Sequence, residues 1–427
     1  MADFNAEVFQ NEYLPAGGTD VHAVVTVTCT GAGTASQSAG GVGELLIIDT
    51  SGSMESPASK IREARLAAAA ALDEIADGTW FAIINGTSEA HLAFPNVRRN
   101  ELPMALMTAE TRKAAKAVVK RLSANGGTAI GSWIELATTV FRAVPDLAQR
   151  HAILMTDGRN ESESSRELQA AVRAAQGVFQ CDCRGVGADW NVDELRSIST
   201  ALLGTVDIIA KPEDMAEDFA GMIRSAMGRG VASAQLRVWT PLGAELLFVR
   251  QVAPTIDDLD GRRTQVSDLI GEYDTGAWGD ESRDFHVAVR VGAKEVGNEQ
   301  LAARVQLVVD GQVVASGLVR ALWSDDSGLT TRINPAVAHY TGQVELASAI
   351  QEGLAAKAAG DDETATSKLG RAVQLAQQTG NEEATSRLKK IVDVQDADTG
   401  TVRLKRDVAK LDEMELDTRS TKTTRVK

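Results

Sequence analysis

The chain has 427 residues, and its 44 Lys plus Arg against 59 Asp plus Glu give a formal charge of −15 at pH 7. The 44% hydrophobic and 24% charged residues are typical of globular proteins. At roughly 150 residues per domain, the length predicts two or three domains. The acidic balance argues against general binding to nucleic acid or to anionic membranes, because both are polyanions.

We recognise no export or membrane-spanning signal in the sequence. Residues 1–18 lack the basic and apolar stretches of a secretory signal, and we find no run of about 18 apolar residues. Cys29, Cys181 and Cys183 are predicted to be buried, reduced thiols, because the last two lie in one strand too close together to bridge. These features predict a cytoplasmic, bacterial protein with no membrane partner and no nucleic-acid partner.

The first 40 residues are predicted to contribute strands to a β-domain that is completed later in the chain. Residues 21–28 alternate apolar and polar side chains, which is the pattern of a half-buried strand. Residues 31–41 are small and rich in Gly and Ser, which predicts a linker.

Residues 41–230 alternate short apolar runs with helical patterns. This alternation predicts an α/β domain with a doubly wound, mostly parallel, Rossmann-like sheet. The predicted strands are 45–49, 80–85, 90–94, 152–156, 178–186 and 206–210. The predicted helices are 59–76, 108–122, 129–143, 164–175, 192–200 and 213–227. Gly86 lies between the second and third strands, which indicates a hairpin with one antiparallel edge strand.

The remaining chain is predicted to form a β-domain, a helical hairpin and a tail. Residues 231–330 predict a small β-sandwich-like domain, with strands at 236–239, 245–249, 285–291, 304–309 and 313–323. Asp310–Gly311 is a hairpin turn between the last two strands. The Ala-rich residues 331–395 predict a helical hairpin. Residues 396–427 predict a polar and largely disordered tail, with a short amphipathic helix between Leu404 and Leu411.

Oxygen-bearing side chains follow the first strand of the α/β region. Asp49, Ser51 and Ser53 stand in the segment DTSGSM, directly after an apolar run. Thr128 lies in a Gly-rich turn before a helix, and Asp157 follows the fourth predicted strand. Ligands collect outside the carboxyl ends of strands in such sheets, so we expect these three turns to converge. Carboxylate and hydroxyl oxygens suit Mg²⁺ or Mn²⁺ better than Zn²⁺. The alternative is that DTSGSM is only a polar turn.

This arrangement closely resembles the von Willebrand factor type A domain and its metal-ion-dependent adhesion site. The family's D-x-S-x-S motif is matched by Asp49, Ser51 and Ser53, its separate Thr by Thr128 in GGTAI, and its later Asp by Asp157 in MTDG. The resemblance covers about residues 44–230, with no departure at the metal positions. It implies that Ser51, Ser53 and Thr128 bind the metal through hydroxyls, and that Asp49 and Asp157 act mostly through water.

The resemblance implies a protein-binding adaptor rather than an enzyme. Neutral hydroxyl ligands leave much of the charge of Mg²⁺, or of Mn²⁺ or Ca²⁺, uncompensated. An acidic side chain of a partner protein can then replace one bound water and complete the coordination.

Other functions remain open. One is a subunit that works with a separate AAA+ ATPase, as von Willebrand A proteins of the chelatase type do. A metal-dependent phosphatase of the haloacid dehalogenase type is disfavoured, because its D-x-D-x-T motif has a second acid where this chain has Ser51. Ser and Thr alternate with basic residues over 418–425, which predicts phosphorylation and docking to a phosphopeptide-binding partner.

Overall fold

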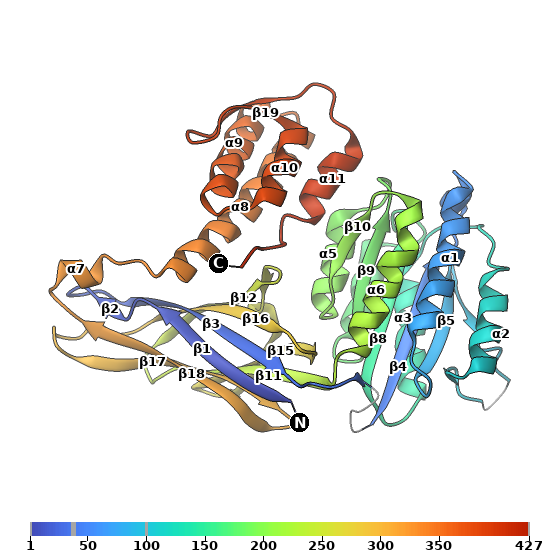
Figure 1. Cartoon of the computed structure of the whole chain (residues 1–427), viewed down its shortest axis with the longest axis horizontal. Coiled ribbons are helices and arrows are strands. Elements are labelled where there is room, and N and C mark those ends of the chain that lie inside the picture. The colour runs from blue at the N-terminus through green and yellow to red at the C-terminus, as the bar shows by residue number, and fades with distance from the viewer. Residues whose placement is uncertain (1, 36–39, 99–100, 426–427) are drawn as a thin grey trace. The chain divides into compact units, whose positions relative to one another are not determined.

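The computed structural model describes residues 2–35, 40–98 and 101–425. Contacts divide the chain into two units (Figure 1). One unit is Ala32–Ala232, and the other combines Met1–Gly31 with Ser233–Lys427. The first unit is therefore an insertion in the chain of the second.

The inserted unit is built on a mostly parallel sheet, as the sequence predicts, but the sheet has seven strands because β7 joins the six predicted ones. Its strands run in the order β10-β9-β8-β4-β5-β6, and β7 pairs with β5. The pairs along this path are parallel except that β6 and β7 run antiparallel to β5. The strands are β4 (Gly41–Asp49), β5 (Trp80–Gly86), β6 (Ala90–Phe94), β7 (Ala105–Leu106), β8 (Leu147–Thr156), β9 (Gln180–Val186) and β10 (Val206–Ile209).

The strand order reverses between β4 and β8. The chain runs from β4 outward through β5 to β6, and it then returns to β8 and runs outward the other way through β9 to β10. Leu45–Ile48 in β4 are fully buried, which explains their continuous apolar sequence. The carboxyl ends of β4 and β8 therefore meet at the switch point where open α/β sheets bind ligands.

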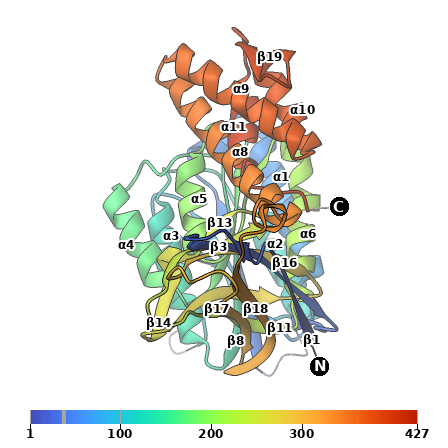
Figure 2. The same ribbon diagram turned by 90° about the vertical axis from the view of Figure 1, so that its left-hand side faces the viewer.

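Helices cover both faces of this sheet (Figure 2). Side chains of α1, α2 and α6 form one apolar cluster with Leu46 and Ile48 of β4, while α3 packs against α4. Side chains cap several helices by accepting hydrogen bonds from amides of the first turn. Ser164 and Glu167 form such a capping box at the start of α4. The helices are α1 (Ser59–Glu74), α2 (Ala109–Val119), α3 (Ile130–Ala143), α4 (Ser165–Ala175), α5 (Val192–Ala201) and α6 (Met215–Met227), with short 3₁₀ turns η2 (Gly52–Glu55) and η3 (Pro212–Asp214).

The second unit contains two sheets that include the N-terminal strands, and their strand pairs are antiparallel except for the parallel pair of β2 with β18. One sheet has the order β1-β3-β16-β12-β13 and the other β14-β15-β11-β17-β18-β2. The strands are β1 (Asp3–Gln10), β2 (Tyr13–Leu14), β3 (Asp20–Thr30), β11 (Val231–Trp239), β12 (Glu245–Ala253), β13 (Asp257–Asp258), β14 (Arg263–Ser267), β15 (Ile270–Trp278), β16 (Ser282–Arg290), β17 (Glu299–Val309) and β18 (Gln312–Trp323). Asp310 and Gly311, with φ of 50° and 76°, form the predicted turn between β17 and β18.

The sequence pattern misses strand β15. Its segment IGEYDTGAW contains two acids and two glycines, so it lacks a continuous apolar or alternating pattern. In the structure, Tyr273 and Trp278 of β15 are fully buried. Burial of these aromatic side chains, rather than local preference, therefore explains why this segment is a strand.

The C-terminal region is more extensive than a helical hairpin. It contains α7 (Ser327–Thr330), α8 (Pro335–Ala358), α9 (Asp362–Gln378), α10 (Glu382–Ile391), β19 (Val392–Asp396), β20 (Thr401–Leu404) and α11 (Lys410–Thr418). Strands β19 and β20 form their own two-stranded sheet. The predicted amphipathic helix at 404–411 is wrong, because β20 ends at Leu404 and the helix begins at Lys410.

The prediction of a largely disordered tail is also wrong as far as residue 425. Leu416 of α11 is 1% exposed and packs into an apolar cluster with α8, α9 and α10. Beyond α11, Thr423 donates from Oγ1 to the carbonyl of Val252 (2.6 Å), and Thr255 forms a β-bridge with Lys422. Hydrogen bonds to a distant strand order this polar segment, although its composition is typical of disorder.

Cys29, Cys181 and Cys183 are buried and free, as predicted. Burial raises the pKa of the Cys29 thiol to about 11, which keeps it protonated. Among the described residues, we find no helix with the length and apolar character needed to cross a bilayer.

A charged cluster is buried across three neighbouring strands of the inserted unit. His151 of β8 contacts Glu44 of β4 through Nδ1 (2.9 Å) and Asp182 of β9 through Nε2 (3.0 Å). Burial opposes charge on the imidazole, but the two carboxylates outweigh it and raise the pKa of His151 to about 9. Burial likewise opposes charge on Asp182, but the hydrogen bond and charge of His151 hold its pKa well below the usual range. The protonated imidazole therefore links the three strands.

This cluster makes stability depend on pH. The pKa of His151 is raised above its ordinary value of about 6.5, so its contribution is complete below that pH and is lost as the pH rises through 9. We expect the free energy of unfolding of the inserted unit to fall by about 3 kcal/mol over this interval. Denaturant unfolding followed at several pH values measures this change.

The variant His151→Gln should lose this pH dependence and be less stable by about 3 to 5 kcal/mol at pH 7, because two buried carboxylates lose their counterion. The exposed His91→Gln is the matched control and should behave as wild type. A wild-type stability that is constant between pH 6.5 and 9 would contradict the assignment.

Candidate functional site

Three loops of the inserted unit converge at the switch point between β4 and β8. Gly52, in the loop after β4, donates its amide to the carbonyl of Gly126 in the loop before α3 (2.9 Å). Ser162, in the loop after β8, donates its amide to the carbonyl of Thr128 (2.9 Å). These main-chain bonds hold the three predicted segments together, although they are far apart in the sequence.

Asp49 lies at the end of β4 and is completely buried. Its Oδ1 accepts a hydrogen bond from the Ser51 amide (2.7 Å), and its Oδ2 accepts one from Oγ1 of Thr156 (2.6 Å). Burial raises the pKa of Asp49 to about 6, although the hydrogen bonds from Thr156 and Ser51 oppose this rise. The carboxylate is therefore held in one orientation by donors of the chain itself.

The two serines and Asp157 form a continuous series of oxygen atoms. Ser51 Oγ lies 2.8 Å from Ser53 Oγ, and Ser53 Oγ donates to Asp157 Oδ1 (2.6 Å). A hydroxyl has one proton to donate, so the Ser51 hydroxyl is the donor to Ser53. These oxygens lie close enough together to act on one ion.

Thr128 faces the same space as Ser53. A Cβ atom added to Gly158 would lie 3.2 Å from Thr128 Oγ1 and 3.4 Å from Ser53 Oγ. Glycine at this position therefore leaves a small cradle between hydroxyls of two different loops. The structure thus brings the oxygens of Thr128, Ser53 and Asp157 to one place, as the sequence predicts.

Lys60 is a residue of this site that the sequence analysis did not identify. Its Nζ lies 2.6 Å from Asp157 Oδ2, and the side chains of Lys60 and Asp157 are 12% and 0% exposed. Lys60 is in the first turn of α1, and no part of the D-x-S-x-S pattern includes it. A basic residue shortly after the motif was visible in the sequence, but nothing there indicated which way its side chain points.

The loop after β8 also supports the start of α3, the helix that follows Thr128. Glu163 accepts hydrogen bonds from the amides of Gly131 (2.5 Å) and Ser132 (3.2 Å), and Asn160 Oδ1 accepts one from the Ile130 amide (2.8 Å). Burial raises the pKa of Glu163 despite these bonds. Side chains from one loop therefore satisfy the free amides of the helix and hold Thr128 near Asp157.

The chemistry of the donors limits which ions they can hold. In the part of the chain that the structure describes, no group of three or more His, Cys, Asp or Glu side chains is placed to hold a metal. The candidate site instead combines two carboxylates with three hydroxyls. This set of hard oxygen donors fits Mg²⁺ and Mn²⁺, while Zn²⁺ prefers nitrogen and sulfur ligands.

Comparison with known proteins identifies the family. Residues 45–208 match the von Willebrand factor type A domain, and residues 374–420 match the von Willebrand factor type A C-terminal domain. The solved structure of von Willebrand factor type A from Catenulispora acidiphila is 46% identical, with a TM-score of 0.93 over 99% of this chain and 97% of that chain. The chain belongs to the von Willebrand factor type A family. The predicted family and fold class are thus confirmed, and the C-terminal match covers α10, β19, β20 and α11.

Two more distant relatives share either the fold at low sequence identity or sequence similarity over half of the chain. The ArnB paralog VWA2 from Sulfolobus acidocaldarius has the same fold, with a TM-score of 0.56 and 15% identity over 98% of each chain. The uncharacterized protein sll0103 of Synechocystis is 26% identical over 219 residues, which are 50% of this chain and 49% of that protein. The matched part thus spans about half the length of this curated relative.

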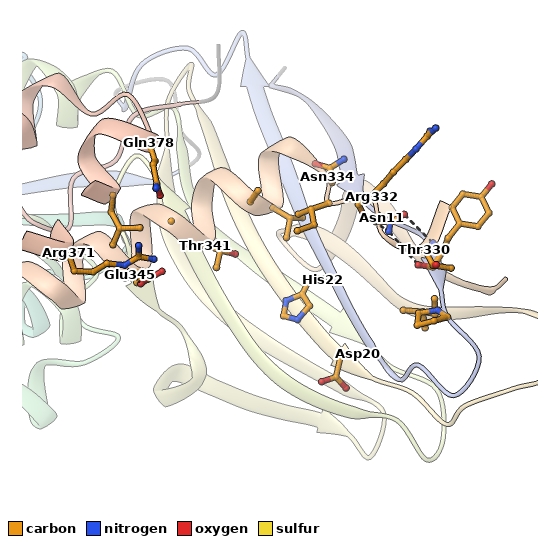
Figure 3. Close-up of a pocket in the computed structure, with 18 residues that line it drawn as sticks. Asn11, Asp20, His22, Thr330, Arg332, Asn334, Thr341, Glu345, Arg371 and Gln378 are labelled. Carbon is orange, nitrogen blue, oxygen red and sulfur yellow. Dashed lines mark hydrogen bonds and ion pairs between the residues drawn. The ribbon is translucent and has the colours of Figure 1, made fainter. Parts of the chain in front are cut away.

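A cavity of about 640 Å³ lies in the second unit, between α8, α9 and the N-terminal strands (Figure 3). Three charged side chains of its wall are paired: Glu345 contacts Arg371 (2.7 Å), and Asp20 contacts Arg290 (2.8 Å). Arg332 also lines this cavity.

The packing of α3 on β5 gives a test of how Thr128 is positioned. Trp133 of α3 donates from Nε1 to the carbonyl of Thr87 (2.7 Å), and a Cβ atom on Gly86 would lie 2.6 Å from the Trp133 ring. We expect Gly86→Ala to lower the free energy of unfolding by about 1 to 3 kcal/mol, because the indole must move.

The control is Gly221→Ala in α6, where no atom outside the neighbouring helix backbone lies within 4 Å of the added methyl group. That variant should be neutral or slightly more stable, since Ala is the better helix former. Equal stability of the two variants in denaturant unfolding would show that Gly86 does not restrict α3.

Proposed function

We propose that Asp49, Ser51, Ser53, Thr128 and Asp157 hold a divalent cation and present it to an acidic side chain of a partner protein. The observation that carries this proposal is the convergence of Ser53, Asp157 and Thr128 around the space beside Gly158. Mg²⁺ is the ion expected, with Mn²⁺ or Ca²⁺ as substitutes.

The residues divide into two roles. The hydroxyls of Ser51, Ser53 and Thr128 would hold the ion directly, and Asp49 and Asp157 would act mostly through water. Asp49 suits an indirect role, because both of its oxygens already accept hydrogen bonds from Ser51 and Thr156. A bound divalent ion would supply a strong positive charge with an open position, which attracts a carboxylate.

The geometry favours binding over catalysis. A phosphatase would use Asp49 as its nucleophile, but this side chain is 0% exposed and both of its oxygens are hydrogen-bonded. Asp157 is likewise engaged, by Ser53 and by Lys60. Neither carboxylate is free to attack a substrate or to move a proton for it.

Two more specific partners were predicted, an AAA+ ATPase and a phosphopeptide-binding protein that docks to the tail. Work with a separate AAA+ ATPase would use the same site, and the identity of the captured partner distinguishes it from other adaptors. Phosphorylation of the tail stays a prediction. Thr423 would first have to give up its hydrogen bond to Val252, and Thr424 Oγ1 accepts one from Gln343 (3.0 Å).

Substitutions at two ligand positions test the proposed metal site. Thr128→Val keeps the side-chain shape but removes the hydroxyl, and Asp49→Ala removes the carboxylate. We expect each change to weaken Mn²⁺ binding by roughly tenfold or more. Titration with Mn²⁺, followed by electron paramagnetic resonance, measures the affinity, and circular dichroism checks the fold.

A pull-down in Mg²⁺ and in EDTA, read by mass spectrometry, tests partner binding. The partner should be lost in EDTA and in the Asp49→Ala variant. Glu89→Ala is the control, because Glu89 is 80% exposed on the β5–β6 hairpin. Equal capture by wild type and Asp49→Ala in both buffers would refute the proposed function.

A further inference from the structure

Lys60 makes a charged contact within the candidate site, and the family motif does not account for it. Its ammonium is bonded to one oxygen of Asp157 (2.6 Å) while Ser53 is bonded to the other (2.6 Å). The side chain of Asp157 is fully buried, and that of Lys60 is mostly buried, with 12% exposed. The ion pair is shielded from water, so its charges act strongly on any ion that approaches.

The helix itself does not explain a lysine at this position. Lys60 lies in the first turn of α1, where the helix dipole disfavours positive charge. No acidic residue lies in that turn to offset it. The contact with Asp157 is therefore the physical reason that the ammonium is held there.

We propose that Lys60 is a built-in counter-cation that weakens metal binding and makes it depend on the acidic partner. This inference rests on the proposed function. Without metal, Lys60 balances one of the two carboxylates, Asp49 and Asp157. A divalent ion added beside the lysine leaves the loaded site with a net positive charge. The partner carboxylate then neutralises that charge, so metal and partner strengthen each other's binding.

The variant Lys60→Met tests this role, because methionine has a similar length and no charge. We expect it to bind Mn²⁺ alone roughly tenfold more tightly than wild type, since the repulsion is removed. In EDTA it should melt at a lower temperature than wild type, because Asp157 loses its counterion. Added Mg²⁺ should raise its melting temperature more than that of wild type.

Two further variants serve as controls. Lys60→Arg keeps the charge and should bind Mn²⁺ within about threefold of wild type. Lys116→Met removes a lysine that pairs with Asp73 elsewhere in the same unit, and it should leave Mn²⁺ binding unchanged. Binding by Lys60→Met alone, with none by wild type, would also support the proposal.

Mn²⁺ binding by these variants distinguishes an error about Lys60 from an error about the metal site. If Lys60→Met binds Mn²⁺ no more tightly than wild type, while Thr128→Val still binds more weakly, Lys60 has no such role and the metal site stands. If wild type and all variants fail to bind Mn²⁺, both proposals are overturned.

Discussion

The reversal of strand order between β4 and β8 is the constraint on which the candidate site depends. Parallel pairing of these two central strands brings Asp49 and Asp157 to one edge of the sheet. Full burial of the apolar segment Leu45–Ile48 holds β4 in the middle of the sheet. Burial of the apolar side chains in these strands therefore stabilises the sheet. The sheet in turn holds the oxygen atoms of the candidate site close together, although they would repel one another in an isolated loop.

The central strands of this sheet carry buried charged groups at two positions along their length. Near their amino ends, Glu44 and Asp182 enclose the imidazolium of His151. At their carboxyl ends, Asp157 is balanced by Lys60. In both places a buried acid has a cation of the chain beside it, which is the condition under which charge is tolerated in a protein interior. The first cluster links three strands, whereas the second joins the loop after β8 to the start of α1.

The C-terminal region illustrates a different source of order. Residues 419–425 have almost no apolar side chains, and their composition alone is typical of a flexible end. They are ordered because Thr423 and Lys422 pair with the segment around Val252 and Thr255. The match of residues 374–420 to a C-terminal domain of the same family agrees with a folded region here.

The sequence by itself predicted the α/β alternation and the mostly parallel sheet, and it indicated five oxygen-bearing residues as candidate metal ligands. Apolar periodicity is a local pattern, as is the D-x-S-x-S motif of Asp49, Ser51 and Ser53, whereas Thr128 and Asp157 were assigned through the family resemblance. The turn at Asp310–Gly311 was equally readable, since positive φ angles favour these residues. Only the tertiary structure decided that β15 is a strand, that residues 419–425 are ordered, and that Lys60 reaches Asp157. Each of these features depends on contacts with a segment that is distant in the chain. Such contacts produce no periodic pattern in the local sequence, so the sequence did not predict them.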